Sequence, residues 1–282
     1  MTLRLDRVRV DVSLLWLLCL ATWSTPSFAE GKYPDWSGQW VRAYPGPARY
    51  DPDKRPGAGQ EAPLKDEYRL LHEQSLKDRE AGGQGLDTTY RCLPLGVPRQ
   101  MTGVSPMEFV IAPKVTYVTF ERMTAQTRRI FTDGRRFPVT GEPFFVGHSV
   151  GKWLDTDGDG RFDTLEVETR NLHGPHTFDD TGIPFHEDDE AVVTERFYLD
   201  RFDPSVLHND ITTTDNALVR PWTGHQRYRR QANEVWKEDN CTADLGHVAI
   251  GSENYLVSDD GYIMPSRKDQ IPPDLRYFKK SE

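Results

Sequence analysis

Apolar residues at every second position are the feature that most restricts the fold of this chain, and they dominate from Pro106 onward. In residues 164–170, which read TLEVETR, leucine and valine alternate with glutamate and arginine. A period of two is the period of a half-buried β-strand. Strands rich in Val, Thr, Tyr and Phe are therefore predicted at 114–121, 127–132, 164–170, 191–199, 206–213 and 222–230.

The connections between these strands favour an all-β fold. No helical period long enough for a crossover separates them, and Asp133-Gly134 and Asp260-Gly261 are pairs typical of hairpin turns. Near the N-terminus, Gly38-Gln39-Trp40 resembles the Gly-x-Trp of lipocalin first strands. The sequence predicts an antiparallel, lipocalin-like β-barrel, with a β-sandwich as the alternative.

One helix is predicted before the strands, at residues 65–81. Strong helix formers fill it, Leu70, Leu71 and Leu76 lie near one face, and Gly82-Gly83 ends it. The preceding residues 30–64 are rich in Pro, Gly and charge, which predicts irregular chain with one brief strand. Residues 65–282 contain no linker and no repeat, so we expect a single β-rich domain.

Residues 1–29 have the pattern of a secretory signal peptide. Three arginines precede the apolar run 12–23, and the small residues of Ser27-Phe28-Ala29 suit cleavage after Ala29. The run is shorter than the roughly 20 residues that span a bilayer, although a single N-terminal anchor helix is the alternative. We expect a periplasmic or secreted protein without a transmembrane segment once the signal is removed.

Export to an oxidising compartment would favour disulfide formation between the cysteines. Removal of Cys19 with the signal leaves Cys92 and Cys241, and an even pair in an exported chain predicts one disulfide. Two unrelated buried thiols are the alternative.

Charge excludes one class of partner. With 44 acidic against 35 basic residues, the net charge is −9. A general nucleic-acid binder needs a basic excess to meet phosphates, so no nucleic-acid partner is expected.

A metal site is predicted at residues 155–166, which fit the calcium-loop pattern D-x-D-x-D-G-x5-E. No helical pattern flanks the loop, so a structural Ca²⁺ ion on a β-hairpin is expected, and no organic cofactor. An acidic turn without metal is the alternative. The predicted ligands are Asp155, Asp157, Asp159, the Arg161 carbonyl, Asp163 and Glu166, the last of which could point away along a strand.

Two further motifs lack the context that their chemistry needs. Residues 147–151 match G-x-S-x-G, but no helix pattern follows as in an α/β-hydrolase, so a glycine-punctuated strand is the better interpretation. His173, His176 and His186, with Glu187, could bind Zn²⁺, but they lack helical spacing. A polar surface loop is expected there.

Polar residues on the predicted strands could line a cavity with an apolar wall. For acid–base chemistry the candidate proton carriers are His148, Glu168 and Glu195. The predicted ligand contacts are Arg128, Trp153, Arg196, Tyr198 and Trp222. The alternative is that most of these residues form the solvent face.

Several segments resemble an uncharacterised family of exported bacterial proteins. The matching segments cover most of the mature chain: YRCLP (90–94), PMEFV (106–110), RRIFTDGR (128–135), GHSVGKW (147–153) and PPDLRY (272–277). The resemblance implies export but no reaction.

Three functions are compatible with these patterns. The leading expectation is an exported β-barrel that binds a small, partly apolar molecule and carries a structural calcium loop. The alternatives are a periplasmic hydrolase or lyase with His/carboxylate acid–base chemistry in the barrel cavity, and a structural envelope protein.

Overall fold

The structure is a computed structural model, and it describes residues 31–44, 61–103, 105–121, 126–138, 141–234, 236, 247–250, 253–257 and 263–272. The predicted signal peptide, residues 1–29, lies outside the described residues.

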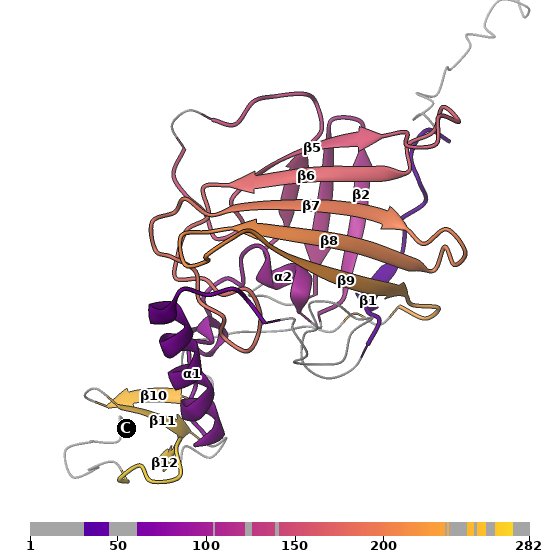
Figure 1. Cartoon of the computed structure of the whole chain (residues 1–282). Coiled ribbons are helices and arrows are strands. Elements are labelled where there is room, and N and C mark those ends of the chain that lie inside the picture. The colour runs from indigo at the N-terminus through magenta and orange to yellow at the C-terminus, as the bar shows by residue number, and fades with distance from the viewer. Residues whose placement is uncertain are drawn as a thin grey trace, which may run out of the picture.

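Nine strands form a closed barrel, which confirms the all-β prediction (Figure 1). Each strand pairs with the next along the chain, and the first pairs with the last. The strands are β1 (Gln39–Arg42), β2 (Met107–Ala112), β3 (Val115–Phe120), β4 (Arg128–Phe131), β5 (His148–Leu154), β6 (Thr164–Arg170), β7 (Val192–Leu199), β8 (Val206–Thr214) and β9 (Trp222–Arg230).

The brief strand expected within residues 30–64 closes the barrel. Strand β1 is only four residues long, yet Trp40 pairs with Met107 on β2 and with Arg230 on β9. The N-terminal segment is thus part of the barrel, joined to residues more than 180 positions away in the chain.

One pair of strands differs from the antiparallel expectation. Strands β4 and β5 run parallel, with Ile130 beside Ser149 and Phe131 beside Val150. The long connection between them carries the chain back to the end at which β4 began, so β5 leaves in the same direction.

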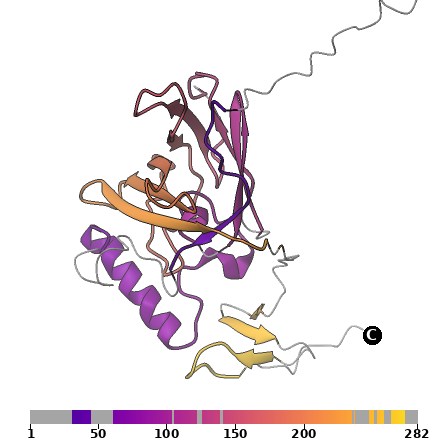
Figure 2. The same cartoon turned by 90° about the vertical axis from the view of Figure 1, so that its right-hand side faces the viewer.

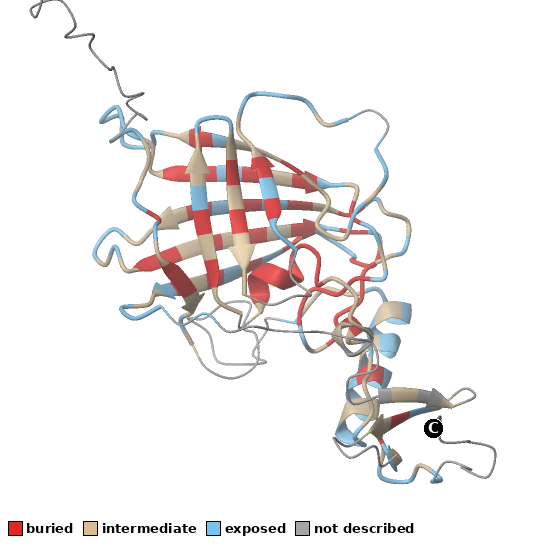
Figure 3. Ribbon diagram, turned by 180° about the vertical axis from the view of Figure 1, so that it is seen from behind, coloured by how far each residue is buried: buried red, intermediate tan, exposed pale blue. Residues whose placement is uncertain are grey.

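Side chains fill the barrel interior. Alternate residues of most barrel strands are buried, as the striped colouring of Figure 3 shows. Trp40, Phe197, Leu207 and Ile211 are 0% exposed, so no water-sized space lies beside them. The expected ligand cavity inside the barrel is therefore absent at these described residues.

The interior also holds a polar network. The guanidinium of Arg128 forms an ion pair with Glu195, and both side chains are almost completely buried. Arg128 also donates to Ser149 and Thr169, while Asn209 donates to the second oxygen of Glu195. These partners compensate for the cost of removing two charges from water.

Helix α1 (Asp66–Glu80) confirms the predicted helix and lies outside the barrel (Figures 1 and 2). Its leucines do not pack into the core: Leu70, Leu71 and Leu76 are 54%, 46% and 37% exposed. Two short helical turns, η2 (Thr88–Arg91) and α2 (Arg99–Thr102), follow it. Among the described residues, none of the helices combines the length and apolar character needed to cross a membrane.

A separate three-stranded sheet lies at the C-terminal end of α1. It consists of β10 (His247–Ile250), β11 (Glu253–Val257) and β12 (Ile263–Pro265). The backbone N–H of Lys268 donates to the carbonyl of Ala81 at 2.8 Å, which ties this sheet to the end of α1 (Figure 2).

Candidate functional site

The predicted proton carriers lie on opposite faces of the barrel wall. The His148 Nε2 atom is 3.2 Å from the backbone oxygen of Glu142, and its ring contacts Phe144 on the outer face. Glu168 also faces outward and pairs with Arg170, whereas Glu195 faces inward. The structure therefore does not bring these three residues into one acid–base site.

The predicted ligand contacts are also separated. Arg128, Trp153 and Trp222 are 1%, 6% and 4% exposed and belong to the packed interior. Arg196 and Tyr198 face outward on β7, where the Tyr198 ring stacks on His208 with centroids 5.0 Å apart.

A shallow groove of about 420 Å³ crosses the outer face of strands β5 to β8. Four of its charged side chains occupy one register row, in which Lys152, Glu166, Arg196 and Asp210 are successive neighbours. Opposite charges in adjacent strands stabilise each other across the sheet. The charges in this row therefore stabilise the outer surface of the sheet. Because each has a neighbour of opposite sign, the row does not favour a ligand of either charge.

The G-x-S-x-G segment is a strand, as expected. Ser149 is 2% exposed and faces the interior, where it lies 2.8 Å from the Thr169 hydroxyl. A Cβ atom on Gly151 would lie 2.7 Å from the side chain of Ile130, so the glycine permits close packing between β4 and β5.

The acidic loop brings three of its predicted ligands together. Carboxylate oxygens of Asp155, Asp157 and Asp159 lie within 4.8 Å of one another, and all three residues are exposed. Asp163 instead accepts hydrogen bonds from Thr156, and Glu166 lies on β6 between Lys152 and Arg196. Arg161 lies in the same turn, where its N–H donates to Asp159 at 2.8 Å.

Cys92 takes part in a disulfide bond. Its predicted partner, Cys241, lies outside the described residues, so the pairing of the two stays a prediction.

A pocket of about 480 Å³ lies between α1 and the connection from β6 to β7, residues 171–191. We call it the α1 pocket. Two regions far apart in sequence contribute to it, residues 68–88 and 175–187. Its lining residues are Tyr68, Leu71, Gly85, Leu86, Thr88, Pro175, His176, Thr177, Pro184, Phe185, His186 and Glu187.

A local fold of the 171–191 connection carries the inner wall. Thr177 and Pro184 form an antiparallel bridge, and the Phe178 N–H donates to the carbonyl of Ile183 at 2.9 Å. Phe178 packs on Trp222 with ring centroids 4.3 Å apart, which fixes this wall to the barrel. The α1 pocket therefore has a rigid floor and a helical outer wall.

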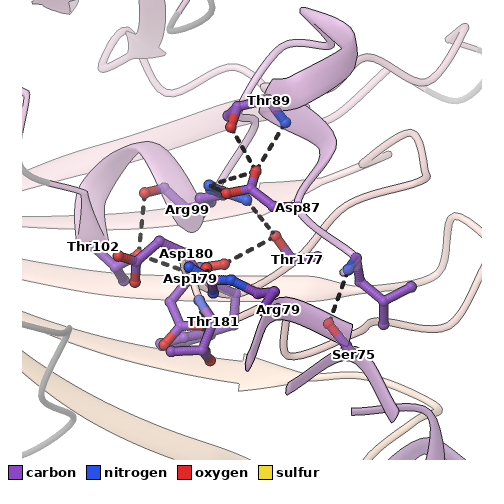
Figure 4. Close-up of polar contacts among 12 residues, drawn as sticks. Ser75, Arg79, Asp87, Thr89, Arg99, Thr102, Thr177, Asp179, Asp180 and Thr181 are labelled. Carbon is purple, nitrogen blue, oxygen red and sulfur yellow. Dashed lines mark hydrogen bonds and ion pairs between the residues drawn. The ribbon is translucent and has the colours of Figure 1, made fainter. Parts of the chain in front are cut away.

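A buried polar network anchors both walls (Figure 4). The Arg99 guanidinium lies 2.9 Å from Asp87 and donates to the Thr177 hydroxyl at 3.0 Å. Burial opposes ionisation of Asp87, but the hydrogen bonds and charge of Arg99 lower its pKa overall. Because Asp87 adjoins Thr88 and Thr177 adjoins His176, this network positions two lining residues.

His176 is the polar side chain with the most unusual environment in the α1 pocket. It is 6% exposed, and neither ring nitrogen has a hydrogen-bond partner among the described residues. Burial lowers the pKa of His176 to about 4, because the charged imidazolium would lose its hydration. The Thr88 hydroxyl, 2% exposed, also lacks a partner among the described residues. These two polar groups beside the pocket thus lack a hydrogen bond, and their polar atoms are shielded from solvent.

A histidine–carboxylate pair lies at the opposite side of the lining. Nδ1 of His186 is 2.9 Å from Oδ2 of Asp188. Asp215 accepts the backbone N–H of His186 at 3.0 Å and holds this residue in place. The Tyr68 ring contacts the His186 ring, with centroids 5.9 Å apart.

The sequence indicated part of this site for a different reason. His176, His186 and Glu187 were candidates for zinc, but the described residues contain no three-residue ligand set around them. His176 is buried, so the expected polar surface loop is also incorrect at this residue. Tyr68 and Thr88 carried no signal, because only tertiary packing places α1 against the 171–191 connection.

No family model, no curated protein and no solved structure matches this chain. Function is therefore inferred from the geometry of the site.

Proposed function

We propose that this chain is an exported binding protein for a small, partly apolar molecule, and that the molecule binds in the α1 pocket. In this proposal the barrel supports the α1 pocket, and the ligand does not bind inside the barrel. Export is inferred from the signal-peptide pattern of residues 1–29.

The observation that carries the proposal is the unpartnered, buried imidazole of His176. A buried polar group without a hydrogen bond costs about 1–3 kcal/mol, and a bound ligand would remove this cost. The apolar wall of Leu71, Leu86 and Phe185 supplies the hydrophobic surface that small-molecule sites use.

A structural calcium ion at Asp155, Asp157 and Asp159 is the second part of the proposal. Three exposed carboxylates within 4.8 Å repel one another, and a hard divalent cation would remove that repulsion. The role is structural, because the loop joins β5 to β6 and is not among the residues of the α1 pocket.

Native mass spectrometry of protein purified from its natural compartment tests the binding proposal. We expect a bound small molecule that is lost in Leu71→Trp, because an indole on this half-exposed lining residue would fill the α1 pocket. Leu70→Trp is the matched control, since Leu70 is 54% exposed on the same helix and does not line the pocket. A ligand retained equally in both variants would place it elsewhere and overturn the proposal.

Acid–base catalysis is a second candidate function, favoured by one observation. Oδ2 of Asp188 lies 2.9 Å from Nδ1 of His186, which is the distance of a carboxylate that positions a general base, although the two atoms do not have hydrogen-bond geometry. Once a ligand is identified, its chemical conversion by the wild type and its persistence with His186→Gln would support catalysis. Recovery of the unchanged molecule from prolonged incubation with wild type would exclude catalysis on that ligand.

A further inference from the structure

The rings and charges that line the α1 pocket restrict the chemical class of its ligand. Four rings contribute to the lining, from Tyr68, His176, Phe185 and His186. Those of His176 and Phe185 meet edge to face with centroids 4.8 Å apart. The faces of aromatic rings attract cations, and clustered rings recognise ammonium groups in this way.

The charges around the pocket have one sign. Glu187 is the one residue with a full charge among the described lining residues. Two more carboxylates contact the lining residue His186: Asp188 lies beside its ring, and Asp215 accepts its backbone N–H. Burial, and then the carboxylates of Glu67, Asp215, Asp188 and Glu187, raise the pKa of the Tyr68 hydroxyl. The local potential at Tyr68 is therefore negative.

Three described arginines lie near the pocket residues in space or in sequence. The Arg79 side chain lies against the lining residue Gly85 and donates to the backbone carbonyl of Asp180. Arg99 is paired with Asp87 beneath the pocket. Arg69, next to Tyr68 on α1, is 2.7 Å from Asp66 and 3.8 Å from Glu73. The carboxylates that act on Tyr68 outnumber the guanidinium of Arg79, so the net charge around the lining is negative.

His176 does not oppose a cation. Because its imidazole is buried without a partner, it is neutral at pH 7 and has one nitrogen able to accept a hydrogen bond. An ammonium N–H is a suitable donor for that nitrogen, whereas a carboxylate ligand would meet Glu187 with repulsion.

We infer that the α1 pocket selects an organic ammonium cation with an apolar body. The inference rests on the proposed binding function and adds the charge of the ligand to it. The cationic head would lie among the rings beside Glu187, and the apolar body would lie along Leu71 and Leu86.

Three probes with one body and three head groups test this inference: 4-phenylbutylammonium, 4-phenylbutanol and 4-phenylbutyrate. Binding of each probe to the mature protein is measured by calorimetry at pH 7. The same titration of the Leu71→Trp variant shows whether the probe binds in the α1 pocket. We expect the cation to bind about tenfold more tightly than the alcohol, and the carboxylate to bind most weakly.

Two variants separate charge from folding. Glu187→Gln should weaken the cation about fivefold to tenfold and leave the alcohol within about twofold, since only the cation senses the lost charge. Glu80→Gln makes the same change of net charge on α1, about 18 Å along the helix axis from the lining residue Tyr68, and should change the binding of neither probe.

The outcomes distinguish the two proposals. If the alcohol or the carboxylate binds as tightly as the cation and Leu71→Trp abolishes that binding, the pocket is a binding site and the inference about charge is overturned. The inference is equally overturned if the cation binds but Glu187→Gln and Glu80→Gln have the same effect. If none of the three probes binds, the inference about charge also fails, and the native-ligand experiment judges the pocket independently.

Discussion

Arg230 lies over the indole ring of Trp40, with its guanidinium carbon 4.8 Å from the ring centroid. Trp40 is on the first strand of the barrel and Arg230 on the last, and the two residues are register partners. Arg230 also donates to the Asp35 carboxylate at 3.0 Å, and the indole N–H of Trp40 donates to the backbone carbonyl of Trp36 at 2.9 Å. The seam that closes the barrel is thus held by side chains as well as by four-residue β1.

Arg230→Ala should lower the free energy of unfolding by about 1 kcal/mol, because it removes the cation–π contact at the seam. Trp40→Ala should cost about 3–5 kcal/mol, since it empties a fully buried site. Denaturant unfolding measures both. Arg229→Ala is the control: its pair with Asp203 is more than half exposed on the arginine side, so a change within about 0.5 kcal/mol is expected. Equal losses for the two arginines would contradict the assigned role of Arg230.

Glu195→Leu should destabilise the barrel by about 3–5 kcal/mol, because it leaves the Arg128 charge buried without its partner. The double variant Arg128→Met/Glu195→Leu should recover most of that loss, since neither buried charge remains. Unfolding of the two single variants and the double variant gives the coupling energy of the pair. Simple addition of the two single losses would show that the ion pair is not coupled.

Stability should fall as the pH is lowered from about 6.5 to 4, in part because of His176. Burial lowers the pKa of His176 to about 4 in the folded protein, against about 6.5 when unfolded. The folded state then binds fewer protons in this window, so the stability present above pH 6.5 is lost as the pH falls towards 4, up to about 3 kcal/mol.

The pH dependence of unfolding should therefore be flatter in His176→Leu than in wild type. Burial also lowers the pKa of His72, so the difference between the two curves, and not the wild-type slope alone, measures His176. His148→Leu is the control, since this ring is on the outer face. Parallel curves for wild type and His176→Leu would contradict the buried, neutral imidazole.

Added Ca²⁺ should raise the midpoint of thermal unfolding, and chelator should lower it. Binding stabilises the folded state by about 2.7 kcal/mol when free Ca²⁺ is 100-fold above its dissociation constant. The response should vanish in Asp155→Ala/Asp159→Ala and persist in Asp269→Asn, an exposed acidic residue remote in sequence. Mg²⁺ should act weakly, because it requires a tighter octahedral site. An unchanged midpoint with Ca²⁺ in wild type would disprove the metal site.

Titration of the unreduced mature protein should find no free thiol, since Cys92 is disulfide-bonded and Cys241 is its predicted partner. Reduction should lower the unfolding midpoint, because the bond closes a loop of roughly 150 residues, worth about 3–5 kcal/mol in the entropy model. Cys241→Ser should then expose one reactive thiol at Cys92. A mature wild-type protein with two reactive thiols would exclude the pairing.

Most barrel strands, the helix and the all-β class follow from local sequence patterns, whereas β2 and the sheet of β10 to β12 were not predicted. Residues 164–170 alternate because one face of β6 contacts the core and the other contacts solvent, and this local period needs no knowledge of neighbours. The prediction of a helix at 65–81 agrees with α1 within one residue at each end. Helix propensities and the Gly82-Gly83 stop are also local properties of the sequence.

Packing between elements, by contrast, sets which polar residues are buried and where a pocket forms. Glu168 and Glu195 carry the same side chain on adjacent strands, yet register turns one outward to Arg170 and the other inward to Arg128. The α1 pocket is lined by Tyr68 and Thr88 from one part of the chain and by His176 from about 90 positions later. Periodicity describes one element at a time, whereas burial of His176 results from packing between elements, and so no local pattern could predict it.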